Sequence, residues 1–257
     1  MKLRLDCLYT LKNYSWLTSC GICLSIIFAS TALAEYKKPK TTSAPDARTT
    51  TSTATRGGCI NNRDSNLKLT ALAPYSHVGQ TTSTHPTFAW FIPDSEYFPL
   101  EFHLEEYTPN SRFKTVYRQK LESKPGIMSL SLPQSLPDLT AGKKYRWKVV
   151  MRCTRYKAVV TMAEIEVVAA TSELKTAFNN VLGIRRLVDV YSSNGLWYNA
   201  FATTFDAANS HQIELQKQLF QELAAVEFQS NSNWVQQQGE KLNEISDRLE
   251  DSKLSQN

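Results

Sequence analysis

The chain has 257 residues, with 29 Lys and Arg, 24 Asp and Glu, and a formal net charge of +5. This length suits one or two small domains. So mild a positive charge argues against the basic surface typical of nucleic-acid-binding proteins, and we expect no nucleic-acid partner.

Residues 1–34 have the three parts of a secretory signal. Three cations within the first 12 residues precede an apolar run, which ends at Ala32-Leu33-Ala34, a small-x-small pattern suited to signal peptidase. The run is roughly 15 residues long, shorter than the ~20 that a membrane span needs. We expect cleavage between Ala34 and Glu35, export to the periplasm or the exterior, and no stable membrane span in the mature chain.

Two alternatives stay open for this segment. One is an uncleaved N-terminal anchor. The other is a lipoprotein, because Leu17-Thr18-Ser19-Cys20 has the letters of a lipobox. A lipobox follows its apolar stretch, whereas here the apolar stretch follows Cys20, so the sequence favours a cleaved signal.

Cleavage also simplifies the cysteine count. Three of the five cysteines leave with the signal, and the mature chain of 223 residues keeps Cys59 and Cys153. In an oxidising compartment such a pair most simply forms one disulfide, with two buried thiols as the alternative. The net charge of the mature chain falls to +3, from 26 Lys and Arg against 23 Asp and Glu.

Residues 35–58 form a segment of low complexity. Thr, Ser, Ala and Pro dominate it, and almost no large apolar side chain occurs between Lys37 and Gly58. Such a segment buries too little surface to offset the entropy of ordering it. The sequence predicts a disordered linker, whose Thr and Ser would also suit O-glycosylation.

Residues 59–168 alternate apolar and polar side chains between turn signals, which predicts strands. The expected strands cover about 67–71, 88–92, 100–105, 113–121, 128–132, 144–153 and 159–168. Short strands at such regular spacing are typical of an antiparallel β-sandwich. The passage Leu139-x-x-Gly142-x-x-Tyr145-x-Trp147 resembles the turn and strand of fibronectin type III and related immunoglobulin-like domains.

The period becomes helical in residues 169–228. We expect helices over 172–193 with a break at Gly183, over 196–208 and over 212–226, with Ser172 as the first N-cap. Six residues fall at the spacings of one tetratricopeptide unit: Leu187, Tyr191, Gly195, Trp197, Ala200 and Ala207. A single copy cannot form a solenoid, so we expect a small helical hairpin packed on the sandwich. The predicted fold class is α+β.

Residues 229–257 are polar, with only a thin stripe of Leu242, Ile245 and Leu249. The sequence predicts either a solvated tail or an exposed helix that depends on a partner.

Signs of catalysis are lacking. The sequence contains no G-x-S-x-G, H-E-x-x-H or P-loop pattern. The histidines, His77, His85, His103 and His211, show no ligand spacing, and the alternation Glu101-x-His103-x-Glu105 looks the same on a metal-binding strand as on a polar sheet face. We therefore predict no catalytic residue, no metal and no cofactor.

Two surface features are candidate binding sites. Arg146, Lys148 and Arg152 share one face of an expected strand and form a basic stripe, to which Arg118 and Lys120 add in one arrangement. This stripe could meet an anionic polymer or lipid headgroups, or be only the wet face of a sheet. The pair Trp197-Tyr198 either packs against the sandwich or lines a groove for a peptide or glycan.

Four stretches of the sequence carry a family resemblance. They are Gly79–Phe91, Pro125–Pro133, Tyr145-Arg146-Trp147 with Arg152-Cys153, and Gly195–Ala200. Over about residues 59–226 the chain resembles the cyanobacterial proteins grouped as domain of unknown function 928, although Asn199 stands where we would expect Asp. The resemblance implies an exported cyanobacterial envelope protein, for which the thylakoid lumen is a further destination. It implies no catalytic residues.

Three hypotheses of function follow. The first is a non-enzymatic interaction module of the cell envelope that binds an envelope protein. The second is a glycan- or peptidoglycan-binding protein that uses aromatic side chains and the basic stripe on a cell-wall glycan. The third is a hydrolase that the sequence patterns do not reveal.

Overall fold

A computed structural model describes residues 35–46, 59, 67–93, 96–108, 113–207 and 209–254. The predicted signal peptide and the greater part of the predicted linker lie outside these residues. All the described residues belong to one unit, Leu33–Asn257.

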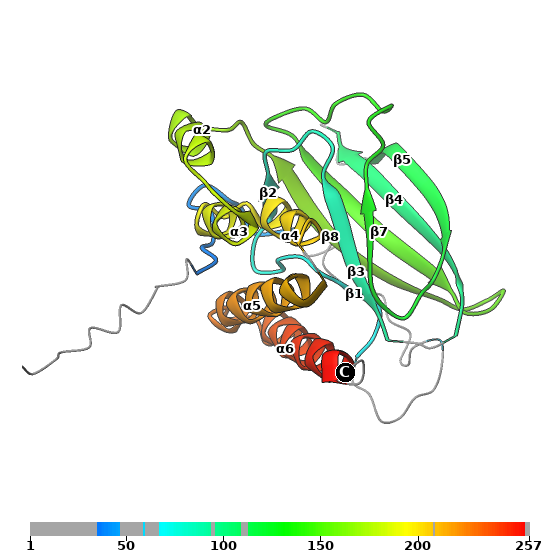
Figure 1. Ribbon diagram of the computed structural model, residues 1–257. Helices are drawn as coiled ribbons and strands as arrows, with labels where there is room; N and C mark the ends of the chain where they lie inside the picture. Colours follow the sequence, from blue (N-terminus) through cyan, green and yellow to red (C-terminus); the bar gives the residue numbers. More distant parts are fainter. Residues whose placement is uncertain are drawn as a thin grey trace, which may run out of the picture. The chain divides into compact units, whose positions relative to one another are not determined.

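Two β-sheets and five helices make up the described part of the chain, an α+β fold (Figure 1). The smaller sheet has the order β1-β3-β6, with β1 Thr70–Ala71, β3 Thr87–Ile92 and β6 Gly126–Ser131. The larger sheet has the order β2-β8-β7-β4-β5, with β2 Gly79–Thr81, β8 Ala158–Val167, β7 Lys144–Arg152, β4 Pro99–Tyr107 and β5 Phe113–Glu122. Neighbouring strands pair antiparallel, except that β2 runs parallel to β8.

Aromatic rings from both sheets form the core between them. Phe88 of β3 lies 5.1 Å from Phe102 of β4 and 5.4 Å from Trp147 of β7, measured between ring centroids. Along β7 the alternate residues from Tyr145 to Met151 are buried, while those between them are half-buried. The period of two in the sequence therefore selects one face of each strand for the core.

The helices follow the sheets in the chain. They are α2 Ser172–Asn179, α3 Ile184–Ser193, α4 Trp197–Thr204, α5 Asn209–Phe228 and α6 Asn233–Leu254. Thr171, one residue before the predicted N-cap, caps α2, because its Oγ1 accepts a hydrogen bond from the Leu174 N–H at 3.2 Å. The predicted break at Gly183 and the end of a helix before Gly195 are both present, and both glycines have positive φ.

The C-terminal residues form helix α6, so of the two predicted alternatives, a helix and a solvated tail, the helix is present. Leu242 and Ile245 are fully buried, and α6 lies along α5 as the second half of a helical hairpin (Figure 1). Gly239 faces the Ala224 carbonyl, where a Cβ would come within 3.2 Å of the oxygen. The thin apolar stripe is thus buried by a partner within the chain, and α5 supplies it.

The beginning of the predicted linker is also ordered, which makes the prediction of disorder wrong for residues 35–46. Tyr36 is only 1% exposed, and the Lys37 N–H donates to the Ser192 carbonyl at 3.0 Å. At Gly195 a Cβ would lie 2.6 Å from Pro39 Cγ, so glycine permits the close approach of this segment. A single buried aromatic ring and its backbone hydrogen bonds supply the stabilisation that the polar composition lacks.

The predicted disulfide is present. Cys59 and Cys153 are joined, with their Cα atoms 4.9 Å apart and 94 positions separating them in the sequence. Cys153 directly follows β7, and both sulfurs pack at the edge of the core. The bridge therefore ties the start of the β-rich region to the end of a central strand.

Candidate functional site

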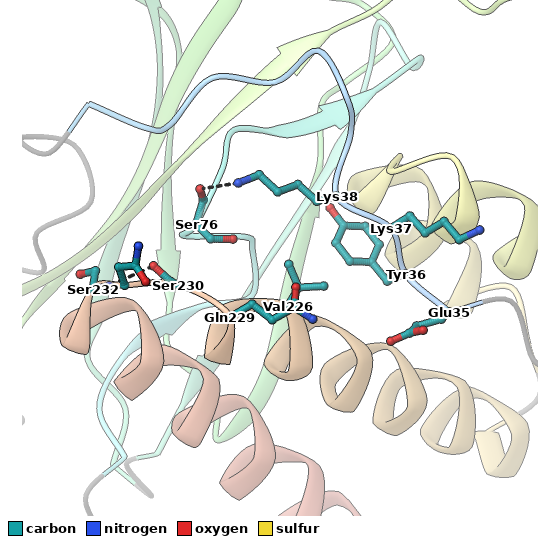
Figure 2. A pocket seen from close by; sticks show the side chains of 10 residues that line it. Glu35, Tyr36, Lys37, Lys38, Ser76, Val226, Gln229, Ser230 and Ser232 are labelled. Atoms are coloured by element: carbon teal, nitrogen blue, oxygen red, sulfur yellow. Dashed lines mark hydrogen bonds between the residues drawn. The ribbon is translucent and has the colours of Figure 1, made fainter.

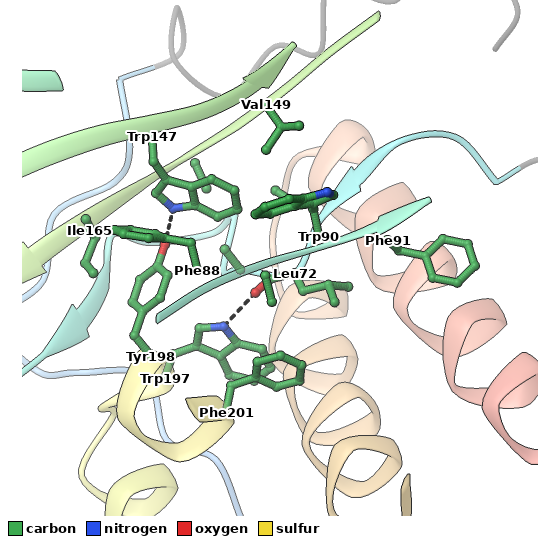
Figure 3. Packing of buried hydrophobic residues seen from close by; sticks show 14 of the residues in the cluster. Leu72, Phe88, Trp90, Phe91, Trp147, Val149, Ile165, Trp197, Tyr198 and Phe201 are labelled. Atoms are coloured by element: carbon green, nitrogen blue, oxygen red, sulfur yellow. Dashed lines mark hydrogen bonds between the residues drawn. The ribbon is translucent and has the colours of Figure 1, made fainter. Parts of the chain in front are cut away.

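Trp197 and Tyr198, predicted as a possible exposed pair, are 0% and 3% exposed. The Trp197 indole N–H donates to the Leu72 carbonyl at 2.9 Å (Figure 3). The Tyr198 hydroxyl donates to the Glu164 carbonyl at 2.9 Å. The Trp147 indole N–H in turn donates to the Tyr198 hydroxyl at 2.8 Å. The prediction that this pair lines a groove is wrong, and the alternative prediction that it packs against the sheets is confirmed. Each ring has a buried hydrogen-bond partner and anchors α4 to the sheets.

The basic stripe is neutralised by acidic residues of β4. Glu105 accepts hydrogen bonds from Arg146 and, at 2.7 Å, from Lys148, while Arg152 lies 3.3 Å from Glu101. Burial alone would raise the pKa of Glu105, but the hydrogen bonds from Lys148 and Arg146 outweigh burial and lower it. Arg146 and Lys148 are therefore partners of Glu105 rather than a free cationic surface, which corrects the prediction.

His103 and its neighbours make a similar pair. His103 Nε2 lies 3.2 Å from Glu101 Oε2, and burial is the main cause that lowers the pKa of His103. Arg118 and Lys120 are exposed on β5, across from His103 and Glu101. Among the residues with described side chains, no group of three or more His, Cys, Asp or Glu is arranged to hold a metal ion.

A cleft of about 830 Å³ lies between the N-terminal segment and the turn that joins α5 to α6 (Figure 2). We call it the N-terminal cleft. Its lining combines polar and apolar surface and carries two lysines: Glu35, Tyr36, Lys37, Lys38, Ser76, Val226, Gln229, Ser230, Asn231 and Ser232. The cleft depends on the ordered segment 35–38, so the sequence, read as a linker there, gave no sign of it.

Behind the cleft lies a chain of hydrogen bonds, the Tyr36 cluster, formed by Tyr36, His77, Ser76 and Glu227. The Tyr36 hydroxyl lies 2.7 Å from His77 Nε2, and His77 Nδ1 lies 2.9 Å from Ser76 Oγ. The Ser76 hydroxyl donates to Glu227 Oε1 at 3.0 Å, and the same oxygen accepts the Tyr75 N–H at 3.1 Å. All three hydrogen bonds of this series can form together when His77 is neutral: the Tyr36 hydroxyl then donates to His77 Nε2, His77 Nδ1–H donates to Ser76 Oγ, and the Ser76 hydroxyl donates to Glu227.

Burial governs the protonation of this cluster. Burial raises the pKa of Glu227 to about 7. It lowers the pKa of His77 to about 3, and the nearby positive charge of Lys38 lowers the pKa of His77 further in the same direction. Burial also raises the pKa of Tyr36. Only Tyr36 and Ser76 of the cluster line the cleft, while His77 and Glu227 are 0% exposed. The cluster fastens the N-terminal segment to α5, and both nitrogens of its imidazole are already engaged.

We expect Glu227→Gln to change the pH dependence of stability. The folded chain holds the Glu227 proton up to a pKa of about 7, above the ordinary value of 4.5. The stability that this proton supplies is complete below 4.5 and lost as pH rises through 7. When the pH is lowered from about 8 to about 4, the free energy of unfolding of wild type, measured in urea, should rise by about 3 kcal/mol relative to that of the variant. A difference that stays constant with pH would contradict this.

A second, smaller pocket of about 360 Å³ lies where α4 meets both sheets. We call it the polar pocket. Hydroxyl, imidazole, amide and carboxylate groups dominate its lining, which consists of Thr81, Ser83, His85, Pro86, Thr87, Ser129, Ser131, Tyr198, Asn199, Ala202, Thr203, Phe205 and Asp206. Three of the stretches that carry the family resemblance, Gly79–Phe91, Pro125–Pro133 and Gly195–Ala200, contribute to it.

Asn199 holds one wall of the polar pocket. Its Oδ1 accepts hydrogen bonds from the Thr81 hydroxyl and the Thr82 N–H, both at 2.9 Å, and its Nδ2 donates to the Thr82 hydroxyl at 3.3 Å. A carboxylate could accept the first two bonds, and the Thr82 hydroxyl could turn to donate the third. The Asn199 carboxamide therefore accepts the same two hydrogen bonds that the Asp expected from the resemblance would accept.

We expect Asn199→Ala to lower the free energy of unfolding by about 1–3 kcal/mol, because the Thr82 N–H and the Thr81 hydroxyl lose their acceptor. Asn199→Asp is the matched variant and should cost less than about 1 kcal/mol, since it keeps that acceptor. Urea unfolding followed by circular dichroism measures both. Equal losses in the two variants would show that the acceptor is not what stabilises this corner.

Several of these residues were missed by the sequence reasoning. Tyr36 stands at the edge of a predicted linker, His77 and Glu227 lie 150 positions apart, and only the family resemblance distinguishes Asn199. A lone aromatic residue beside a polar segment was the one signal available. Pairings at such sequence separation become visible only once the chain is folded.

The sequence profile of the family described as "Domain of Unknown Function (DUF928)" matches residues 51–237. No curated protein matches the sequence significantly. Among the described residues, no helix is both long and apolar enough to cross a membrane.

Matches to solved structures are weak. Vertebrate-specific Astrotactin-2, a perforin-like membrane protein, has a TM-score of 0.27 at 13% identity over 66% of this chain and 34% of its own. Two Bacteroides uniformis β-glucuronidase structures have TM-scores of 0.21 and 0.24, at 16% and 11% identity, over 37% and 61% of this chain and 12% and 31% of theirs. The chain thus spans about a third or less of each, and none of the three defines its fold or function.

Proposed function

The chain belongs to the family described as Domain of Unknown Function (DUF928), and from that premise we propose that it is an exported, non-enzymatic interaction module of the cell envelope. The signal pattern in residues 1–34, with cleavage between Ala34 and Glu35, supports export. The Cys59–Cys153 disulfide fits an oxidising compartment, such as the periplasm, the cell exterior or the thylakoid lumen of a cyanobacterium.

The N-terminal cleft is the observation that carries this proposal. It offers a partner two cations, Lys37 and Lys38, together with amide and hydroxyl groups from Gln229, Asn231 and Ser232. Such groups suit the backbone and acidic side chains of a protein segment. In the titratable cluster nearest the cleft, both imidazole nitrogens of His77 are engaged within the protein, and the imidazole and the Glu227 carboxyl are buried away from the cleft, which supports binding over hydrolysis.

The finer architecture of the proposal is an immunoglobulin- or fibronectin-III-like sandwich that serves as a platform for the helices. The antiparallel pairings and the aromatic core between the two sheets support this, while the parallel β2–β8 pair is a departure from it. In the same reading, α3 and α4 form the tetratricopeptide-like hairpin, and the α5–α6 hairpin lends its turn to the cleft.

The test uses the mature chain as bait on solubilised envelope proteins, with covalent cross-linking. Asn231→Trp should fill the cleft and abolish capture of a defined protein partner, and soluble polysaccharide should not compete. Lys175→Trp, on the exposed face of α2, is the control and should capture the partner as wild type does. Equal capture by Asn231→Trp would place the partner elsewhere and refute the cleft as its site.

A second candidate function, binding of a cell-wall glycan, is supported by the polar pocket. Ser129 Oγ and the exposed Asp206 carboxylate line this pocket and make no hydrogen bond with other described residues, and the half-buried Phe205 is part of the same lining. Hydroxyl and carboxylate groups next to an aromatic ring suit the polar edge and the apolar face of a sugar.

Co-sedimentation with purified peptidoglycan sacculi tests this second function. Asp206→Ala and Phe205→Ala should release the protein from sacculi, whereas Asp247→Ala, on the exposed side of α6, should not. Trp197→Ala is unsuitable for this purpose because Trp197 is buried. Undiminished sedimentation of both pocket variants would exclude the polar pocket as a glycan site.

A further inference from the structure

The hairpin that joins β7 to β8 ends in an unusually exposed aromatic ring. We call residues Cys153–Lys157 the hairpin tip. Tyr156 is 93% exposed, the highest value among the large hydrophobic side chains described. The guanidinium carbon of Arg155 lies 6.0 Å from the centroid of the Tyr156 ring. A large aromatic ring that stays in water buries almost no apolar surface when the chain folds, so the Tyr156 ring is available to a partner.

The hairpin tip is braced at its base. The disulfide joins Cys153 to Cys59, and the N–H groups of Cys153 and Thr154 both donate to the Lys157 carbonyl, at 2.9 and 3.1 Å. The Thr154 hydroxyl accepts from the N–H of Tyr156 at 3.3 Å and of Lys157 at 3.1 Å. A loop held in this way loses little conformational entropy when its side chains bind, so the brace favours affinity.

Positive charge accumulates at this point of the sequence. Arg152, Arg155 and Lys157 fall within six residues, and no Asp or Glu occurs between Val150 and Ala163. Arg152 shares its charge with Glu101 at 3.3 Å, whereas Arg155 projects with Tyr156 at the tip itself. The tip therefore presents a cation and an aromatic face together.

Sheet register adds a second aromatic side chain at this end of the larger sheet. Leu100 at the start of β4 pairs with Met151 at the end of β7, so Tyr97, which is 65% exposed, precedes β4 at the end where the tip projects. Glu96 and Glu122 also belong to this end, beside the exposed Lys124. The positive charge is thus concentrated on the tip and does not extend over the whole end of the sheet.

We propose that the hairpin tip, with Tyr97 at the same end of the larger sheet, is a docking surface for an anionic polysaccharide. The Tyr156 ring supplies a flat apolar face on which a sugar ring stacks, and the Arg155 guanidinium pairs with a carboxylate or sulfate of the polymer. This surface shares no residue with the N-terminal cleft or the polar pocket, and the proposal holds whichever of them is the site of the first function.

A lipid surface fits the same residues less well. Three cations contribute about 1 kcal/mol each near an anionic membrane, and stable anchoring needs a second, apolar signal. Tyr156 provides one ring with a polar end, and Glu96 and Glu122 would face the same headgroups. A polymer with repeated acidic groups avoids both problems, because it engages the tip alone and offers many equivalent sites.

Affinity electrophoresis of the oxidised mature protein tests the proposal, in gels that contain polygalacturonate or neutral dextran. Wild type should be retarded by polygalacturonate alone, and rising salt should weaken the retardation. Tyr156→Ala and Arg155→Ala should each weaken binding about tenfold. Two exposed residues of the helical region provide matched controls, and Leu182→Ala and Lys175→Ala should bind as wild type does.

Three outcomes would overturn the proposal. Wild-type affinity in both tip variants would assign the polymer to another surface. Equal retardation by dextran would show that the acidic groups play no part. Binding to phosphatidylglycerol vesicles without retardation by polygalacturonate would assign the tip to a membrane.

Discussion

Trp197→Ala is expected to lower the free energy of unfolding by about 3–5 kcal/mol, the cost of truncating a fully buried indole. The Trp197 ring is 0% exposed, stacks on Phe201 with 5.8 Å between centroids and meets the edge of Tyr36 at 5.4 Å. Its loss leaves a cavity and also removes the hydrogen-bond donor of the buried Leu72 carbonyl. Urea unfolding followed by circular dichroism measures the effect.

Two variants make this measurement specific. Trp197→Phe keeps much of the ring but not the N–H, and should cost about 1–3 kcal/mol less than the alanine variant. Leu182→Ala removes a side chain that is 80% exposed, and should change stability by about 0.5 kcal/mol at most. If Trp197→Ala cost as little as Leu182→Ala, the α4 helix would not be anchored through this ring.

Reduction of the Cys59–Cys153 disulfide is expected to lower the free energy of unfolding by about 4–5 kcal/mol, because the bridge closes a long loop in the unfolded chain. The two cysteines are 94 positions apart, and the bridge also holds the base of the hairpin tip. Unfolding in urea with and without dithiothreitol measures the loss. The Cys59→Ser/Cys153→Ser double variant should have the same free energy of unfolding as the reduced protein, and dithiothreitol should not change it.

This result bears on the polysaccharide proposal as well. If the bridge orients Tyr156, the reduced protein, tested under conditions where it stays folded, should bind polygalacturonate more weakly than the oxidised form. A reduced protein that is as stable as the oxidised one would mean that the chain-entropy argument fails here.

The order and kind of the elements were largely predictable. The alternation in 144–153 corresponds to β7 and that in 159–168 to β8, and helices occur where the period changes after 168. Local patterns were sufficient for this because strand and helix periods depend on neighbouring residues. The two-residue β1 and the parallel pairing of β2 with β8 had no comparable local pattern.

The candidate binding surfaces were predicted less well. The sequence leaves open whether Trp197 and Tyr198 line a groove or pack against the sandwich, and the structure decides for packing, since both are buried with their polar atoms satisfied. Arg146 and Lys148 were read as a possible anionic-polymer site, yet Glu105 on the neighbouring strand pairs with both. A side chain's availability depends on what lies across the sheet or above the helix, and sequence spacing does not report that.

By itself the sequence determined the family, the two cysteines that form the disulfide and the succession of strands and helices. These follow from composition, motif and local period. Tertiary structure alone decided that Tyr36 anchors the start of a supposed linker, that α5 buries the stripe of α6, and that Tyr156 stands in solvent while Trp197 does not. The physical reason is common to all three. Burial and charge pairing arise between residues that are far apart in the sequence, and their contribution to the free energy depends on contact in space and not on position along the chain.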